Sequence, residues 1–298
     1  MGVMRWVRRG ALVLVGLTAM AIGGVYAQSE RVIEAKAAPP SRQAPVVGHD
    51  SATLALGQKL TIANGCQDCH TSSLGGKVMI DDAAFARVIA TNLTGGEGGV
   101  LARYDDRALD AAIRDGVGWD GRKLWIMPSK EFSSLADADV AAIIANIRAR
   151  APVANVLPAR IVRPVGRALF ATGKLPFAYD LIDHSRQTLA VAPAGGTVEQ
   201  GRYLAAGCTG CHGANYAGAE VHGAPPGTPL SPNLTPAGRL STWTEAEFIR
   251  AIRTGVRPDG TTMKDLMPWK AFSMRSDEEL KSVYAYLRTL PSAPSPEK

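Results

Sequence analysis

Two copies of one five-residue motif contain every cysteine in the chain. The motifs are Cys66-Gln67-Asp68-Cys69-His70 and Cys208-Thr209-Gly210-Cys211-His212. In a Cys-x-x-Cys-His motif the two thiols can add to the vinyl groups of haem, and the adjacent imidazole is held beneath the porphyrin within reach of the iron. The spacing therefore predicts two covalently bound haem c groups. The attachment residues would be Cys66, Cys69, Cys208 and Cys211, with His70 and His212 as iron ligands.

Disulfides, a redox dithiol or a zinc site are the alternatives for paired cysteines. A structural zinc site needs four ligands in a tetrahedral arrangement. Here the two motifs lie far apart in the sequence, and each is accompanied by its own set of further motifs. Two motifs that use every cysteine and each end in histidine favour haem over these alternatives.

The motifs belong to a longer internal repeat with a nearly constant offset. Residues 57–60 match 201–204, 92–94 match 233–235, 112–114 match 251–253, 116–117 match 255–256, 120–121 match 259–260, and 127–128 match 267–268. A constant offset indicates two copies of one structural unit. We therefore predict two domains, 57–150 and 197–292, and call them the first and second copy.

The repeat also supplies a candidate sixth ligand for each iron. Methionine thioether is the soft, neutral axial ligand that cytochromes c use opposite histidine. Met127 and Met267 each precede a proline at equivalent places in the two copies. We predict that His70 and Met127 ligate one iron, and that His212 and Met267 ligate the other. The competing side chains, none of which recurs in both copies, are Met79, Met263, Met274, His49, His184 and His222.

Apolar periodicity predicts three principal helices in each copy. In the first copy they are expected at 54–62, from Asp105 or Asp106 to Arg114, and in a terminal helix with the apolar stripe Val140, Ile143, Ile144 and Ile147. In the second copy they are expected at 198–206, from Thr244 to Ile252, and at 276–287, where Ser276 and Glu279 form a capping-box pattern. We therefore predict an all-α fold, in which short helices and loops wrap around each haem.

Several repeated or neighbouring side chains have two open interpretations. Arg114 and Arg253 occupy equivalent positions and would either pair with haem propionates or be solvated. Trp125, Trp269 and Tyr284 would either contact porphyrin or pack elsewhere.

The remaining segments connect or extend the two copies. Residues 28–56 are expected to form an extended spacer, and residues 293–298 a tail. Residues 151–196 contain five prolines and are expected to strap the copies together, with a short helix at 165–171.

The N-terminus has the pattern of an export signal. Arg5, Arg8 and Arg9 precede an uncharged stretch from Gly10 to Ala27. This pattern fits either a cleaved signal peptide or a retained membrane anchor within residues 1–27. Both alternatives place residues 28–298 in the periplasm.

The net charge of +6 does not indicate nucleic-acid binding. Three of the positive charges lie in residues 1–27, and neither copy contains a basic patch. Because nucleic-acid recognition needs a clustered positive surface, we do not expect a nucleic-acid partner.

Together, the Cys-x-x-Cys-His motifs, the two Asn-Leu-Thr segments and the Met-Pro loops resemble class I cytochrome c domains. The run Met267-Pro268-Trp269-Lys270, with Phe272, is similar to the tandem cytochrome subunits of membrane-bound bacterial alcohol and sugar-acid dehydrogenases. Those subunits usually carry three haems, whereas this chain has two motifs. The resemblance implies a dihaem electron carrier rather than an enzyme, working in a periplasmic respiratory chain. Its donor would be a dehydrogenase or quinol, and its acceptor a soluble cytochrome or terminal oxidase.

Two other functions are compatible with two bound haems. One is a dihaem enzyme, such as a cytochrome c peroxidase or thiosulfate dehydrogenase, in which one iron has an open or exchangeable position. A methionine in both copies disfavours it. The other is a haem-based sensor, which the sequence disfavours because no signalling domain is recognisable.

Overall fold

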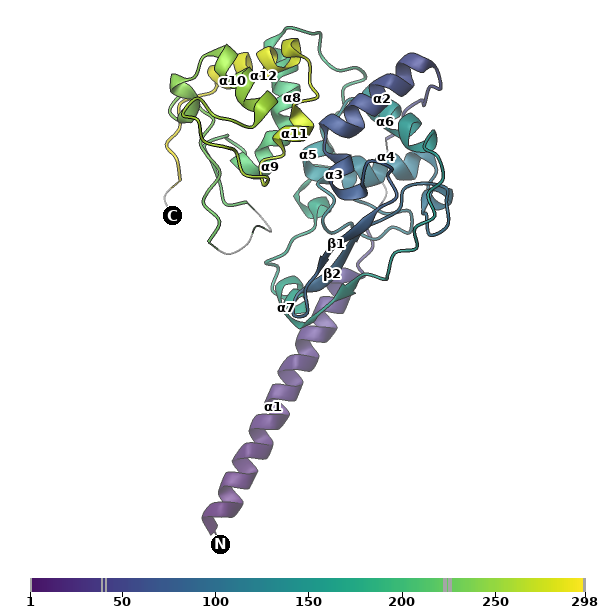
Figure 1. Ribbon diagram of the computed structural model, residues 1–298. Coiled ribbons are helices and arrows are strands. Elements are labelled where there is room, and N and C mark those ends of the chain that lie inside the picture. Colours follow the sequence, from purple (N-terminus) through teal and green to yellow (C-terminus); the bar gives the residue numbers. More distant parts are fainter. Residues whose placement is uncertain (1, 39, 41, 222–223, 225–226, 297–298) are drawn as a thin grey trace.

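The computed structural model describes residues 2–38, 40, 42–221, 224 and 227–296. Helices dominate this part of the chain, and five of them occur in the same order in each copy (Figure 1). The first copy contains α2 (Ser51–Ala63), α3 (Cys66–His70), α4 (Asp106–Asp115), α5 (Ser129–Phe132) and α6 (Asp137–Arg148). The second contains α8 (Val198–Ala205), α9 (Thr209–His212), α10 (Glu245–Thr254), α11 (Trp269–Phe272) and α12 (Asp277–Thr289). The six principal helices predicted from periodicity are all present.

Local sequence signals explain where these helices begin and end. The hydroxyls of Thr244 and Ser276 accept hydrogen bonds from the backbone at the third position of α10 and α12, and Glu247 and Glu279 complete both capping boxes. Asp105 caps α4 in a similar way. The helices α4 and α10 end at glycines with φ of 68° and 69°, a left-handed conformation that glycine adopts without strain.

The first and last helices of each copy pack against each other at a repeated glycine. A Cβ atom on Gly57 of α2 would lie 1.9 Å from the carbonyl oxygen of Ala142 in α6. A Cβ atom on Gly201 of α8 would lie 1.9 Å from the carbonyl oxygen of Ser282 in α12. The predicted apolar stripes of α6 and α12 are buried at these crossings and form the centre of each core. Close backbone contact therefore explains why both glycines belong to the repeat.

A small antiparallel sheet in the first copy corrects the all-α prediction. The strands β1 (Lys77–Asp81), β2 (Ala86–Ala90) and β3 (Ile161–Val162) pair in the order β1-β2-β3, with an irregularity between Val78 and Ile80. Alternate residues of β2 are buried, as in a half-buried strand. The sheet lies between α3 and the α7 region (Figure 1).

The N-terminal helix is longer than predicted and joins the folded body. The helix α1 (Gly2–Ile33) continues six residues past Ala27, so the extended spacer begins later than residue 28 and ends at α2. Most of α1 projects from the body (Figure 1). From Met4 to Ile33 it is long and apolar enough to cross a membrane, with a mean hydropathy of 1.9. Its last turns pack against α7 (Pro164–Ala171), the helix predicted within the connecting segment.

We expect Gly201→Ala to lower the free energy of unfolding by about 2 kcal/mol, because the new methyl group forces α8 and α12 apart. This loss outweighs the gain in helix propensity that alanine normally brings. Chemical denaturation followed by circular dichroism measures the difference. Gly207→Ala is the matched control, since its Cβ would meet no atom within 4 Å. Equal stability of Gly201→Ala and the unsubstituted protein would contradict the packing argument.

Candidate cofactor-attachment sites

Each Cys-x-x-Cys-His motif lies on a short helical segment directly after the first long helix of its copy. The first motif is α3, and the second spans the 3₁₀ turn η3 (Ala206–Cys208) and α9. All four cysteines are free of disulfides, and each is only partly exposed. Burial raises the pKa of Cys66 to about 12 and that of Cys208 to about 11. Because redox-active thiols need a lowered pKa, these raised values disfavour a redox-active dithiol.

The histidine of each motif is oriented by the same hydrogen bond. Nδ1 of His70 lies 2.8 Å from the carbonyl oxygen of Thr91, and Nδ1 of His212 lies 2.8 Å from that of Pro232. When Nδ1 donates to a carbonyl, Nε2 carries the lone pair that binds metal. Burial lowers the pKa of both imidazoles and so favours their neutral form. The neutral form of both histidines is therefore favoured, with the lone pair of Nε2 available to bind a metal ion.

The Asn-Leu-Thr segments hold the loops that supply these carbonyls. The side-chain amide of Asn92 donates to the carbonyl of Val153 at 2.7 Å, and that of Asn233 donates to the carbonyl of Ala293 at 2.7 Å. In both copies the asparagine oxygen accepts from the backbone of the threonine two residues later. Each asparagine thus fixes its loop to the extended segment that follows the terminal helix. The sequence did not predict this role, although both asparagines belong to the internal repeat.

In each copy, the loop before the short helix α5 or α11 brings the candidate methionine to the apolar core of that copy. Met127 packs against the apolar core of the first copy and Met267 against that of the second. Each is followed by a proline at the start of a short helix, α5 or α11. By contrast, Met274 is 48% exposed and Met79 lies in β1. The repeated placement favours Met127 and Met267 as ligands.

Residues 198–291 match the family model described as cytochrome c. This part of the chain is a cytochrome c domain. The matched range contains the second motif and Met267. The chain is 38% identical over 97 residues to the cytochrome c subunit of a quinone-dependent alcohol dehydrogenase from Gluconacetobacter polyoxogenes, covering 30% of this chain and 21% of the relative.

Two further relatives extend this similarity. The fructose dehydrogenase cytochrome subunit of Gluconobacter japonicus is 35% identical over 102 residues, covering 31% of this chain and 21% of that subunit. A nicotinate dehydrogenase subunit of Pseudomonas putida is 30% identical over 231 residues, covering 71% of this chain and 19% of its own length. The chain thus matches about a fifth of the length of these relatives. The resemblance to dehydrogenase cytochrome subunits is confirmed.

The other histidines do not assemble a metal site beside the cytochrome c domain. His49 is exposed, and His184 contacts the carboxylate of Asp115 and the carbonyl of Tyr179. His222 lies outside the described residues. Within the described part of the chain, no group of three or more His, Cys, Asp or Glu side chains could hold a metal ion. A protein-only zinc site therefore finds no support in the described residues.

The repeated arginines form ion pairs that connect helices in both copies. Arg114 is buried and pairs with Asp110 at 2.6 Å and with Asp137 at 2.6 Å. Arg253 pairs with Asp277 at 2.6 Å, the equivalent of Asp137 in the second copy. These ion pairs join α4 to α6 and α10 to α12. Carboxylates therefore pair with both guanidiniums, while Nη2 of Arg114 is buried without a hydrogen-bond partner among the described residues, so propionate pairing stays a prediction.

The aromatic side chains near the methionine loops are held by protein contacts. Trp125 lies 4.9 Å from the ring of Phe170, in a cluster that includes the end of α1. Trp269 packs on Gly255, and the hydroxyl of Tyr284 donates to the carbonyl of Trp243 at 2.7 Å. These contacts favour packing over porphyrin contact for all three side chains.

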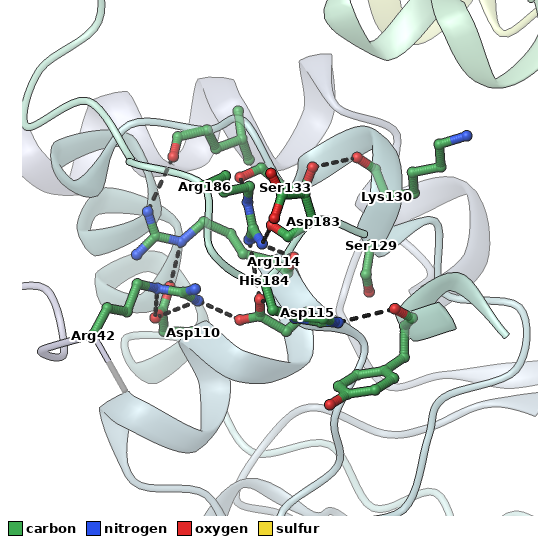
Figure 2. Close-up of polar contacts among 12 residues, drawn as sticks. Arg42, Asp110, Arg114, Asp115, Ser129, Lys130, Ser133, Asp183, His184 and Arg186 are labelled. Atoms are coloured by element: carbon green, nitrogen blue, oxygen red, sulfur yellow. Dashed lines mark hydrogen bonds and ion pairs between the residues drawn. The ribbon is translucent and has the colours of Figure 1, made fainter. Parts of the chain in front are cut away.

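A buried charged cluster positions the loop that carries Met127. Figure 2 shows Asp115 facing three cationic or titratable groups: Arg42 of the spacer at 2.5 Å, and Arg186 at 3.0 Å and His184 at 3.3 Å from the connecting segment. Arg186 also donates to the carbonyl of Ser133, immediately after α5. The cluster thus ties the spacer and the connecting segment to the end of α4, and Arg186 ties the connecting segment to the backbone directly after α5. Burial opposes the ionisation of Asp115, but bonds and charges from the two arginines outweigh it, so its pKa is lowered.

We expect Asp115→Asn to lower the free energy of unfolding at about pH 7 by about 3 kcal/mol, because two partly buried arginines lose the buried carboxylate that they share. The lowered pKa of Asp115 means that its contribution is present above the ordinary value of 3.8 and is lost as the pH falls below it. Urea denaturation at about pH 7 and about pH 3 should therefore show a smaller acid-induced loss in the variant than in the unsubstituted protein.

Asp265→Asn is the matched control, because that carboxylate is 88% exposed. An acid-induced loss of the same size in Asp115→Asn and in the control would exclude the cluster as a source of the pH dependence.

Proposed function

We propose that this protein is a dihaem electron carrier with one six-coordinate haem c in each copy. The haems would be attached through Cys66 and Cys69 and through Cys208 and Cys211, with His70–Met127 and His212–Met267 as axial pairs. The observation that carries the proposal is the equal orientation of the two histidines, each with Nδ1 2.8 Å from a backbone carbonyl. The family match covers the second copy, and the geometry repeats in the first.

The residues of each copy suit reversible electron transfer. A bound haem supplies one-electron chemistry at iron. The neutral imidazole and the soft thioether are ligands that both iron states accept, and the apolar core around each methionine excludes water. Because a methionine recurs in both copies, neither site keeps the open position that a peroxidase needs. This disfavours the enzyme alternative.

The relatives indicate the class of redox partner. Their names describe cytochrome subunits of alcohol and fructose dehydrogenases, and a subunit of a nicotinate dehydrogenase. The last match extends over 231 residues, more than the second copy contains, so it also includes sequence outside that copy. We infer a dehydrogenase or quinol as electron donor and a soluble cytochrome or terminal oxidase as acceptor, in a periplasmic respiratory chain.

Haem counting and methionine replacement test this proposal together. The pyridine haemochrome absorbance and intact mass should give two covalent haems per chain. We expect Met127→Ala and Met267→Ala each to open one haem to carbon monoxide and to lower its reduction potential, because each variant removes one axial thioether. Optical titration of the reduced protein with carbon monoxide measures the binding. Met274→Ala is the control, since this exposed methionine has no counterpart in the first copy.

One haem per chain would refute the dihaem assignment. Carbon monoxide binding to the unsubstituted protein, or peroxide turnover with a reduced dye, would favour the enzyme alternative. Variants that bind no more carbon monoxide than the control would refute the methionine assignment.

We also propose that α1 is retained as a membrane anchor. Residues on both sides of Ala27 belong to one helix, and those after it are packed into the body. Ser29 and Ile33 are buried, and Glu30 pairs with Arg167 of α7 at 2.8 Å. The uncharged stretch from Gly10 to Ala27 rises about 27 Å, close to the thickness of the hydrocarbon core of a bilayer. Arg5, Arg8 and Arg9 would remain on the cytoplasmic side.

Mass spectrometry of the protein purified from membranes is expected to show residues 1–27 still attached. The protein should remain in the membrane fraction after a carbonate wash, because about 20 apolar residues span the bilayer. Replacing Met20 and Ile22 by arginine should release it, because a charge at the bilayer centre costs about 3 kcal/mol. A soluble mature protein beginning at residue 28 would show that the segment is a cleaved signal.

A further inference from the structure

The two copies meet through pairs of residues that the repeat makes equivalent. Lys59 of α2 forms an ion pair with Glu279 of α12 at 2.7 Å. At the equivalent positions, the hydroxyl of Tyr203 of α8 donates to Asp139 of α6 at 2.6 Å. Each pair joins the first helix of one copy to the terminal helix of the other. The copies are therefore related by an approximate two-fold arrangement.

The short helices after the methionine loops lie in the same interface. Contacts join α5 of the first copy to η3 and α9, and α11 of the second copy to α2 (Figure 1). A Cβ atom on Gly210 would lie 2.4 Å from Oε1 of Glu131 in α5, which shows how close this carboxylate is to the second motif. The interface thus brings side chains of the first copy to the haem-attachment residues of the second.

Arg275 breaks the two-fold similarity at the centre of this interface. Its equivalent in the first copy is Leu135, a buried core residue. Arg275 is only 6% exposed, and Nη2 lies 3.4 Å from Oδ1 of Asn64, two residues before Cys66. Its charge also reaches Cys208, where it opposes the raising of the thiol pKa by burial. A buried cation therefore contacts the residue two positions before the first attachment motif, and its charge acts on the second motif.

The charges that face Arg275 come from both copies. Glu279, Asp139 and the hydroxyl of Tyr203 interact with it electrostatically. Each carboxylate has a further partner, Lys59 for Glu279 and Tyr203 for Asp139. Of this group, Arg275 is the member whose charge acts on Cys208, whereas the opposite charge of Glu131 acts on Cys211.

We propose that Arg275 sets the reduction potential of the second haem, because its buried positive charge lies at the interface between the copies and acts on the attachment site at Cys208. This proposal rests on the dihaem function proposed above. Reduction adds one electron to the site, and a nearby cation in a poorly solvated position stabilises the added charge. Glu131 acts in the opposite direction from the first copy. The potential of the second haem is therefore tuned by residues of both copies.

Redox titration of the holoprotein tests this assignment. We expect Arg275→Gln to shift the ferrous-to-ferric equilibrium of the second haem about tenfold toward the ferric form, which is about 59 mV for a one-electron couple. Glu131→Gln should shift it toward the ferrous form, and Arg275→Lys should retain most of the original potential because it keeps the charge. The wave that Met267→Ala moves identifies the second haem.

Lys270→Gln is the matched control, because it removes one positive charge from α11 at a side chain that is 70% exposed. The control should leave the potential unchanged, and the Arg275→Gln shift should persist in about 1 M salt, where exposed charges are screened within about 3 Å. An unchanged potential in folded Arg275→Gln overturns the proposal. Shifts of the same sign in Arg275→Gln and Glu131→Gln also overturn it, because they indicate disturbed packing rather than charge.

If Arg275→Gln does not fold, the Glu131→Gln and Arg275→Lys variants test whether Arg275 sets the potential of the second haem. A normal potential in Glu131→Gln together with a lowered one in Arg275→Lys would then refute the assignment. The unsubstituted protein separates this proposal from the function on which it rests. A single one-electron wave there refutes the dihaem function, whatever the Arg275 variants show.

Discussion

In each copy, the arrangement of the surrounding elements depends on the hydrogen bond from histidine Nδ1 to a backbone carbonyl. The carbonyl belongs to a loop, and the loop must be fixed if the imidazole is to keep one orientation. Asn92 and Asn233 fix it by donating hydrogen bonds to the segment after the terminal helix. That helix is in turn held against the first helix at Gly57 or Gly201, directly before the motif. In both copies, the contacts of the histidine, the asparagine and the glycine therefore connect the motif, the loop, the terminal helix and the first helix to one another.

The two copies share these contacts but differ in what surrounds them. The first copy carries the small sheet, the spacer and most of the connecting segment, and Asp115 gathers these additions around the end of α4. The cytochrome c domain of the second copy has fewer added segments among the described residues. A charged side chain of the first copy, Glu131, lies close to its attachment motif. The same local geometry thus sits in two different electrostatic surroundings. Such a difference would allow the two proposed haems, although chemically identical, to have different potentials.

The sequence predicts the motifs, the repeat and the principal helices, because these depend on spacing and apolar periodicity. It does not predict the partner of either histidine, since that partner is a backbone carbonyl and the residues supplying it, Thr91 and Pro232, are dissimilar. The strands escaped prediction because β1 is mostly exposed and lacks a clear alternation.

Long-range partners are equally inaccessible to sequence reasoning. The repeat identifies Arg114 and Arg253 as equivalent, but only the structure brings Asp137 and Asp277 to them. Tyr203 and Lys59 are chemically unlike, so the repeat alone does not suggest that they perform the same task at the interface. Pairs of this kind depend on how the copies are placed in space, which periodicity does not encode.

The junction between α1 and α7 determines how an anchored protein would diffuse and meet its redox partners. Ion pairs of Arg167 with Glu30 and of Arg160 with Glu34, together with the buried side chain of Ile33, join the helix to the body without a flexible hinge. A body held in this way would diffuse in two dimensions and present a constant face along the membrane. Encounters would then depend on lateral collision and on the height of the partner's docking site above the bilayer. A partner would be selected by geometry before any contact between surfaces is made.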